Sequence, residues 1–555
     1  MDYSNSIRHW QYLILFIAAG ILFSKCAPAE DEIEVFCENL QEYIETLSSN
    51  EFEGRAPSTP GGEKTVEYIE KHFNRIGLTP AVNGSYRQTV PLVEITPSNI
   101  SDLQVRGSGS EMSFEYHDEM MVNSVRLGKE EVKLDNSELV FVGYGVNAPE
   151  YNWNDYENVD VEGKTVVILV NDPGFAIGDE ELFTGHAMTY YGRWTYKFEE
   201  AARQGAEAAL IVHQTEPAGY EWNVVSSSWS GPNLELDAER ETTPVLVEGW
   251  IQKNVAEEIF QKAGTSLQEL SEKAIQRDFT PVSLDMTASV SFNNSYHTSE
   301  SHNVIGYIEG SKHPDEYFVY MAHWDHLGKV ETEEGEVEIY NGAVDNATGT
   351  AGVICLAEKF LSLEETPERT LVFMAVTAEE SGLLGSRYYG ENPVFPLPST
   401  VAGINMDALN VYGPTHDVSV VGYGSSDLDN YLREHARAQN RRIEPEEHPE
   451  RGYYYRSDHF SMARHGVPMI YANGGSDYIG RDEEYSEMVA EDYNSRYHMP
   501  SDVIHDLWNF DGLHQDLWLF FSIGEDLANS DNFPNWVEGN EFRAIRDETE
   551  HKRRR

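Results

Sequence analysis

Short unbroken runs of apolar residues recur in the second half of the chain, and each ends in a polar loop. Such runs are typical of strands that are buried on both faces of a sheet, and helix-period segments lie between them. The expected elements, in order, are a strand at 317–322, a helix from Thr348, a strand at 370–377, a helix from Ser381, strands at 401–406 and 417–422, a helix from Ser426, a strand at 467–472 and a helix at 510–528. This alternation predicts an α/β fold with a mostly parallel or mixed sheet covered by helices.

A different pattern occupies the middle of the chain. From about residue 137 to 264, short β-rich runs such as LVFVGYGV and KTVVILVND alternate with helix-like segments such as YKFEEAARQGA. A chain of 555 residues can bury more than one core, so we expect one domain interrupted by another. The predicted boundaries are 31–115 for the first part of the main domain, 116–290 for a β-rich α+β insert, 291–535 for the catalytic part and 536–555 for a charged tail.

The first 26 residues have the pattern of an export signal, with Arg8 before an apolar stretch at 12–23. About twelve apolar residues are too few to cross a bilayer. The segment LFSKC resembles a lipoprotein cleavage site in which Cys26 is acylated, and ordinary signal cleavage is the alternative. We therefore expect an exported protein that is periplasmic, an outer-membrane lipoprotein or extracellular, with membrane contact only through a lipid on Cys26.

Two further cysteines, Cys37 and Cys355, remain after such a cleavage. Cys355 lies in the apolar helix pattern AGVICLAEKFL, so we expect it to be a small buried hydrophobic residue and predict no disulfide framework.

The chain is strongly acidic, with 40 basic against 95 acidic residues and a formal charge of −55. Phosphate backbones would be repelled, so nucleic acid is excluded as an expected partner. The acidic residues are spread along the chain, which fits either a surface adapted to high salt or an ordinary acidic exported protein.

Acidic residues and histidines cluster where the expected strands end. One H-x-D pair, one adjacent pair of glutamates or one DNATG turn alone has an ordinary structural explanation, but together they form a possible ligand set. Zinc takes imidazole nitrogen and carboxylate oxygen, and a pair of metals needs about five side chains with one of them shared. The residues are His323, Asp325, Asp345, Glu379, Glu380, Asp407, Tyr497 and His498.

Spacing suggests a role for several of these residues. Asp325 is two residues beyond His323 on an extended segment, so its carboxylate can accept a hydrogen bond from the far ring nitrogen of that histidine. Adjacent glutamates point in opposing directions, and we assign Glu380 to a metal and Glu379 to the general base. Asp345 lies in a turn before a helix, from which a carboxylate can bridge two ions.

In this order the motifs resemble those of the secreted di-zinc aminopeptidase family, which includes bacterial aminopeptidase S type enzymes and, more distantly, glutamate carboxypeptidase II. The resemblance implies two zinc ions per chain, with His323 and Asp407 on one, Glu380 and His498 on the other, and Asp345 bridging them. It also implies that Glu379 is the base. Asn346 departs from the family pattern, which often has a second aspartate there, and is expected to alter hydrogen bonding in the turn.

The same resemblance covers two further features. Tyr497, beside His498, is implied as a donor to the oxyanion of the tetrahedral intermediate, or it merely packs there. The 116–290 insert resembles a protease-associated domain, although more loosely. Within it, the aromatic segment around Tyr190, Tyr191, Arg193 and Trp194 either faces a substrate or packs in the insert's own core.

The function expected from this resemblance is hydrolysis of the first peptide bond of peptides or proteins that have a free N-terminus. The tyrosine-rich segment 453–460 is expected to form an apolar side-chain pocket or ordinary core. One alternative is a carboxypeptidase of the glutamate type, for which Arg456 is a candidate receptor of the substrate carboxylate. A glutaminyl cyclase would use one zinc, and a non-catalytic receptor-like relative would have lost ligands or the base, whereas none is missing here.

Overall fold

The computed structural model of the chain describes residues 33–178, 182–240, 242–332 and 335–553. The predicted export signal and Cys26 lie outside these residues. From Phe36 onward the chain forms one compact unit. Within the described residues, every helix is too short or too polar to cross a bilayer.

A parallel sheet lies at the centre of the catalytic part. Strands β17 (Arg369–Val376), β14 (His313–His323), β18 (Thr400–Asn405) and β21 (Met469–Gly474) are neighbours in that order and run parallel. On its two sides the sheet is extended by antiparallel pairing, with β13 (Val282–Ile308) beside β17 and β19 (Asp417–Val420) beside β21. The last strand, β20 (Arg442–Pro445), runs parallel to β19. The predicted α/β class with a mixed sheet is confirmed.

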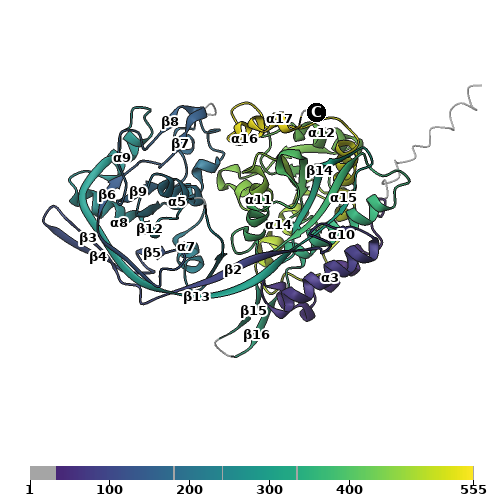
Figure 1. The fold of residues 1–555 in the computed structure, drawn as a ribbon, viewed down its shortest axis with the longest axis horizontal. Coiled ribbons are helices and arrows are strands. Elements are labelled where there is room, and N and C mark those ends of the chain that lie inside the picture. The colour runs from purple at the N-terminus through teal and green to yellow at the C-terminus, as the bar shows by residue number, and fades with distance from the viewer. Residues whose placement is uncertain (1–32, 179–181, 241, 333–334, 554–555) are drawn as a thin grey trace, which may run out of the picture. The chain divides into compact units, whose positions relative to one another are not determined.

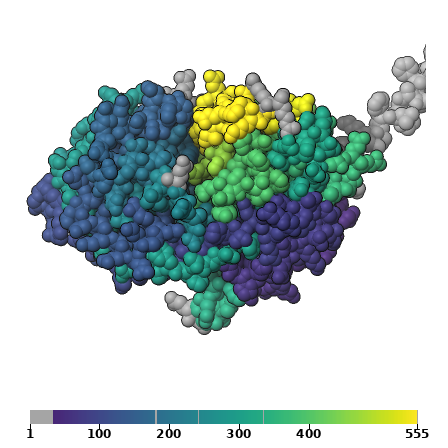
Figure 2. All heavy atoms as spheres, viewed as in Figure 1, coloured from purple at the N-terminus to yellow at the C-terminus, as the bar shows by residue number. Residues whose placement is uncertain are grey.

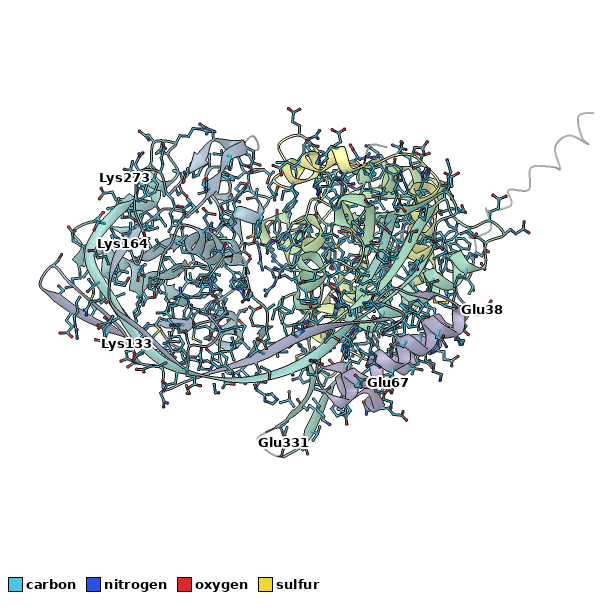
Figure 3. All side chains as sticks on the ribbon, in the orientation of Figure 1. Glu38, Glu67, Lys133, Lys164, Lys273 and Glu331 are labelled. Atoms are coloured by element: carbon cyan, nitrogen blue, oxygen red, sulfur yellow. A yellow bond between two sulfur atoms is a disulfide. The ribbon has the colours of Figure 1, made fainter. Side chains whose placement is uncertain are left out.

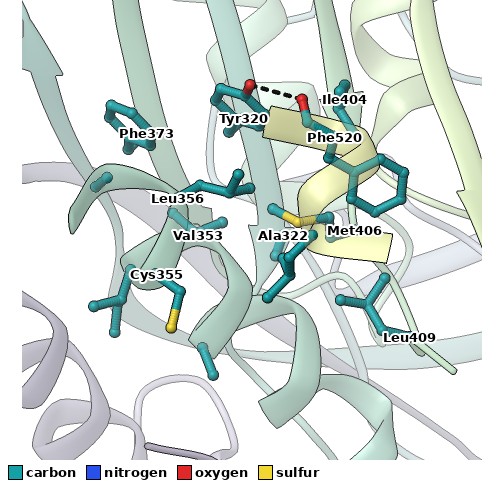
Figure 4. Close-up of a cluster of buried hydrophobic side chains, with 14 of the residues drawn as sticks. Tyr320, Ala322, Val353, Cys355, Leu356, Phe373, Ile404, Met406, Leu409 and Phe520 are labelled. Carbon is teal, nitrogen blue, oxygen red and sulfur yellow. Dashed lines mark hydrogen bonds between the residues drawn. The ribbon is translucent and has the colours of Figure 1, made fainter. Parts of the chain in front are cut away.

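Helices cover both faces of this sheet, as alternation along β14 demonstrates. Phe318, Tyr320 and Ala322 join the core formed with helices α2 (Leu40–Leu47), α3 (Pro60–Ile76), α10 (Thr348–Leu361), α12 (Leu428–Ala438) and α15 (Asp511–Ala528). The Tyr320 hydroxyl donates to the Phe520 carbonyl in this core at 2.9 Å (Figure 4). Val319 and Met321 point to the other face, toward α11 (Leu384–Glu391) and α13 (His459–Ala463).

The inserted lobe is built around a second sheet, in which β6 (Glu131–Phe141), β9 (Thr165–Leu169), β10 (Ala208–His213) and β12 (Val247–Gln252) run parallel. Strand β5 (Met120–Asn123) closes this order antiparallel to β12, and β3 (Leu103–Gly107) and β4 (Ser110–Phe114) form a hairpin. Helices α5 (Trp194–Arg203), α8 (Lys253–Lys262) and α9 (Leu267–Ala274) pack on it in two apolar clusters.

Strand β13 joins the lobe to the catalytic part, because its 27 residues pair with β3 and β6 at one end and with β17 at the other. Strand β2 (Arg87–Ser98) runs antiparallel beside it from Asn293 to Val304, and the two are seen together in Figure 1. The predicted boundary at residues 290 and 291 therefore falls inside one continuous strand.

Cys37 and Cys355 form a disulfide with their Cα atoms 5.8 Å apart, so the prediction that Cys355 is merely a small hydrophobic residue is wrong. Cys355 is buried in α10 as expected, but folding brings a partner to it that lies 318 residues away in the sequence. The bond ties the start of the compact unit to α10, the helix that follows the Asp345 turn.

The segment expected to be a charged tail contains α16 (Arg543–Glu548) and α17 (Glu550–Arg553). Trp536 and Phe542 are buried in it, and Arg546 donates to the backbone carbonyls of Thr400 and Val401 at the start of β18. In the space-filling view this segment, in yellow, lies against the surface of the catalytic part (Figure 2).

Some of the acidic side chains lie on the surface. Glu38, Glu67 and Glu331 are exposed and are labelled at the outside of the molecule in Figure 3.

Candidate functional site

The predicted site residues lie where the parallel strands end. His323 is the last residue of β14, Glu379 and Glu380 follow β17, and Asp407 follows β18. Carboxyl ends of parallel strands meet at one edge of a sheet, which is where open α/β sheets place their sites. The structure therefore brings together residues that are up to 175 positions apart, from His323 to His498.

The inner position, defined as His323, Asp345 and Asp407, is deeply buried. Nε2 of His323 lies 3.2 Å from Asp407 Oδ1 and 3.3 Å from Asp345 Oδ1, and the His323 side chain is 1% exposed. The other oxygen of Asp407 accepts a hydrogen bond from the Ser457 hydroxyl at 2.6 Å. Asn405 donates in turn to Ser457 at 2.7 Å, so the carboxylate of Asp407 is held from behind.

The outer position, defined as Asp345, Glu380 and His498, is more open. Nε2 of His498 lies 3.1 Å from Asp345 Oδ2 and 3.1 Å from Glu380 Oε2, and its side chain is 34% exposed. Asp345 thus faces the inner histidine with one oxygen and the outer histidine with the other. This is the arrangement that a bridging carboxylate needs.

The donor spacing fits zinc. Two ligands bound at about 2.0–2.1 Å in tetrahedral geometry lie about 3.3 Å apart, and the four distances between histidine nitrogens and carboxylate oxygens are 3.1–3.3 Å. Imidazole and carboxylate are also the ligand types that zinc takes, so the side chains present could hold two ions.

The histidines and carboxylates of the site shift one another's pKa values. Burial alone would lower the pKa of His498, but hydrogen bonds with Asp345 and Glu380 raise it to about 10. Burial would lower the pKa of His323 as well, but Asp407 and Glu379 hold it well above its usual range. The pKa of Asp345 would be raised by burial, but hydrogen bonds with both histidines hold it well below its usual range. The metal-free site therefore holds protons on its histidines where cations would bind.

Glu379 lies beside the inner position but is not one of the proposed metal ligands. One oxygen of its carboxylate is within 4.8 Å of ligand atoms of His323 and Asp407. Burial raises the pKa of Glu379 well above its usual range, and the neighbouring charges of Asp407 and Glu380 raise it further. A carboxyl group in such surroundings is suited to take up a proton.

The expected contact between the Asp325 carboxylate and the His323 ring is not formed. Nδ1 of His323 lies 3.1 Å from the backbone carbonyl oxygen of Asp325 and 3.8 Å from its carboxylate. The carboxylate accepts instead from the backbone N–H of Glu379 at 3.2 Å. Asp325 thus orients the ring through its main chain, and its side chain fixes the loop that carries the glutamates.

The turn around Asp345 is held by three residues. Asn346 donates to the Met406 carbonyl at 2.9 Å and accepts from Gly349 N–H at 2.9 Å, which ties the turn to the end of β18. Asp502 accepts from the backbone N–H of Asp345 at 3.1 Å. Arg55, almost fully buried, donates to carbonyls in both the His323 loop and this turn, those of Trp324 at 2.9 Å and Gly342 at 2.8 Å.

Positive φ angles occur at several places in the chain, and three of them lie at or beside the proposed ligands and base. Ala378, Ala408 and His498 have positive φ angles of 54°, 52° and 57°, a region that side chains other than glycine rarely adopt. Each is one of the site residues or adjoins one. Strain of this kind persists where the surrounding structure fixes a geometry that function requires.

Sequence reasoning missed four residues that hold the site: Arg55, His326, Ser457 and Asp502. His326 lies in the same HWDH motif as His323, and its second histidine is a signal that could have been used. Asp502 closes the motif RYHMPSD that contains His498, which is a signal of the same kind. Ser457 carried no such signal, because its contact depends on how distant loops fold together. Arg55 lies in the segment EGRAP, where a single arginine gives no indication that it will be buried.

Tyr497 lies at the mouth of the outer position. Its ring stacks on that of His498 with centroids 3.9 Å apart, and the residue is 50% exposed. Burial and nearby carboxylates raise the pKa of its hydroxyl above the usual range, so it stays protonated and able to donate.

The aromatic segment 453–460 serves mainly as core. Tyr454, Tyr455 and Phe460 are buried in the same cluster as Tyr190 of the lobe, whose ring lies 5.0 Å from that of Phe460. Of the two interpretations of this segment, packing therefore accounts for most of its aromatics, and only Tyr453 is exposed.

The segment from residue 303 to residue 519, which contains every proposed ligand, matches the model of peptidase family M28. This part of the chain, less than half of its length, is similar to peptidase family M28. The remainder, including the lobe, lies outside the matched segment.

Among curated proteins, the chain resembles a glutamate carboxypeptidase 2 homolog of Caenorhabditis elegans, with 36% identity over 22% of this chain and 15% of that protein. It also resembles the aminopeptidase NAALADL1 of Mus musculus, with 33% identity over 21% of this chain and 15% of that protein. The matched part thus spans only about a seventh of the length of these relatives. A solved aminopeptidase from Aneurinibacillus sp. strain AM-1 aligns over 88% of this chain and 92% of its own, with 19% identity and a TM-score of 0.44.

Proposed function

We propose that this protein is an exported di-zinc aminopeptidase. The observation that carries the proposal is the set of four histidine–carboxylate distances of 3.1–3.3 Å, arranged around one shared carboxylate. In this proposal His323 and Asp407 hold one zinc ion, Glu380 and His498 hold the other, and Asp345 bridges them. Metal ions so placed would activate a water molecule and polarise the scissile carbonyl group.

Glu379 performs the proton transfers. Its carboxylate takes a proton from the attacking water and returns it to the leaving amine nitrogen, so one residue serves as base and then as acid. Metal ions beside Glu379 would favour its ionised form and bring its raised pKa down. In this proposal the protonated hydroxyl of Tyr497, whose ring stacks on that of His498, donates to the oxyanion.

The surplus of carboxylates supports recognition of a free α-amino group. Among the described side chains of the site, His323, His326, His498 and Arg55 face a larger group of acidic residues. A protonated amine is a cation that this potential attracts, and binding it would fix the first peptide bond beside the reacting water. The acidic residues are Asp325, Asp345, Glu379, Glu380, Asp407, Asp458 and Asp502.

A second candidate function, a carboxypeptidase, is favoured by one observation. Lobe residues 188–193 pack against residues 449–456, with Met188 N–H bonded to the Pro449 carbonyl at 3.1 Å. Arg193 and Arg456 come from these two facing segments, and the buried Nε of each has no hydrogen-bond partner among the described residues. Arg456 directly precedes Ser457, which contacts Asp407. A substrate carboxylate bound to both arginines would supply the missing partner.

A panel of paired peptides separates the two functions. For an aminopeptidase, acetylating the substrate amine abolishes cleavage, whereas amidating the C-terminus has little effect. A requirement for the free carboxylate, with blocked N-termini tolerated, would establish the carboxypeptidase instead. Cleavage of neither free peptide by the zinc-loaded protein would reject both.

Export is supported by the Cys37–Cys355 disulfide, because structural disulfides persist mainly outside the reducing cytosol. Acylation of Cys26 is part of the proposal. Fractionation tests it, since Cys26→Ala should move the protein from the membrane fraction to the soluble exported fraction.

A further inference from the structure

His326 contacts the carboxylate of Glu380 and has no role in the chemistry proposed above. Its Nδ1 lies 2.6 Å from Glu380 Oε1, and its side chain is fully buried. The other oxygen of that carboxylate, Oε2, is the one that faces His498 at 3.1 Å. The two histidines thus contact opposite oxygens of one carboxylate.

The short contact indicates a hydrogen bond rather than shared coordination of a metal. Two ligand atoms on one tetrahedral zinc lie about 3.3 Å apart, as the four ligand pairs of this site do. At 2.6 Å the His326 and Glu380 atoms are too close for that arrangement. The distance matches a strong hydrogen bond to a charged acceptor, with Nδ1–H of His326 donating.

The ring of His326 has little freedom to turn away. Gly342, with φ at 53°, packs directly against it, and a Cβ atom there would lie 2.6 Å from the ring Cγ. The His498 ring meets it edge-on, with centroids 5.6 Å apart. Nε2 of His326 is buried without a hydrogen-bond partner among the described residues. The polar contact of this side chain is therefore the one that Nδ1 makes with Glu380.

We propose that His326 is a positioning residue that holds Oε1 of Glu380 and thereby keeps Oε2 turned toward the outer metal position. The inference rests on the proposed function, because it assumes that Glu380 binds metal. Hydrogen-bond partners of metal ligands typically contribute about 10–100-fold to metal affinity. The effect should fall mainly on the outer ion, since the hydrogen bond of His326 goes to Glu380, which is not a proposed ligand of the inner ion.

The test compares His326→Leu, which removes the donor, with His326→Asn, whose amide nitrogen can stand near the position of Nδ1. Zinc affinity is measured on the full chain by competition with a chromophoric chelator. His326→Leu should bind one zinc normally and the other about 10–100-fold more weakly, and His326→Asn should recover most of that loss. His72→Leu removes another buried imidazole, in α3 and away from the site, and should leave both affinities unchanged.

Two results would overturn the inference: normal affinity for both ions in His326→Leu, or equal weakening in the Leu and Asn variants, which would mean that the ring only fills space. If His326→Leu fails to fold, His326→Met, a flexible donor-free side chain, replaces it in the same comparison. Wild-type protein that binds no zinc would instead contradict the proposed function. Failure of the His326 inference and failure of the proposed function therefore give different results.

Discussion

The inner and outer positions of the site use the same kinds of ligand but are built differently. The inner ligands His323 and Asp407 sit at the ends of adjacent strands, and Ser457 and Asn405 fix the second of them from buried positions. The outer position depends on His498, which lies after helix α14 (Glu483–Arg496) with its side chain 34% exposed.

This difference has consequences for metal and substrate. Ligands on a rigid sheet lose little freedom when an ion binds, whereas a ligand on an exposed loop must be ordered. We therefore expect the inner ion to be the tighter one, and the substrate to approach from the outer side, where Tyr497 is exposed and His498 is partly exposed.

The largest expected effect comes from a residue that belongs to neither ligand set. Glu379→Gln should lower kcat by about 10²–10⁴-fold, because it removes the group that moves protons. Metal content should stay near two per chain, since Glu379 is not a proposed ligand. Steady-state kinetics and elemental analysis of the same sample check both statements. Loss of an ion together with activity would mean that Glu379 is itself a metal ligand, and the inner position would then include it.

Asp345→Ala is the substitution that should affect both positions at once. Because one carboxylate contacts both histidines, its loss should remove or greatly weaken both ions, whereas His498→Ala should cost only one. Elemental analysis after dialysis gives the counts. Two ions retained in Asp345→Ala would show that the positions are independent and that no bridge exists.

The strand-end residues are the part of this site that the sequence alone predicts. Buried parallel strands read as continuous apolar runs, so the amino-acid pattern is enough to place His323, the glutamate pair and Asp407 at one sheet edge. The helix at Glu483–Arg496 is not predictable in this way, because it is acidic and lacks a clear apolar stripe. Without that helix, the sequence leaves His498 in an undefined loop.

Contacts made through the main chain or over long separations are equally hidden in the sequence. The role expected of the Asp325 carboxylate is taken by its backbone carbonyl, which no residue type can signal. The pairing of Cys37 with Cys355 and the burial of Tyr454 and Tyr455 against the lobe arise only when distant segments meet. Both follow from tertiary packing, which local patterns do not encode.

The rate of metal loss should differ between the inner and outer positions. When fully loaded protein is mixed with a strong chelator, we expect two phases. The outer ion should leave about tenfold faster or more, because its histidine is partly exposed and its glutamate relies on the hydrogen bond from His326. Absorbance of a chelator–zinc complex follows both phases. Ser457→Ala should speed the slow phase alone. A single phase in the wild type would contradict the assigned asymmetry.

Lowering the pH should weaken metal binding at both positions. The pKa of His498 is raised to about 10, and that of His323 is raised by Asp407 and Glu379, so both histidines favour the protonated form in the metal-free protein. Zinc must displace these protons, and affinity should therefore rise by about tenfold per pH unit for each histidine below its pKa. Calorimetry in buffers of different ionisation enthalpy should report net proton release. Binding without proton release would contradict the assigned ligands.

The raised pKa of His498 also determines how the stability of the metal-free protein changes with pH. Because the folded pKa of His498 lies above its unfolded value, its stabilisation is fully present below about pH 6.5 and is lost as the pH rises through about 10. Thermal unfolding of chelator-treated protein should therefore occur at lower temperature near pH 10 than near pH 7. The zinc-loaded protein should lack this component, since its histidines are already deprotonated.

Anomalous diffraction at the zinc edge, from crystals of the zinc-loaded full chain, would show whether this sheet edge holds two zinc ions around one shared aspartate. We expect two peaks, one in contact with His323 and Asp407, the other with Glu380 and His498, and both in contact with Asp345. A single peak, or a second peak bound by His326 in place of His498, would contradict this expectation.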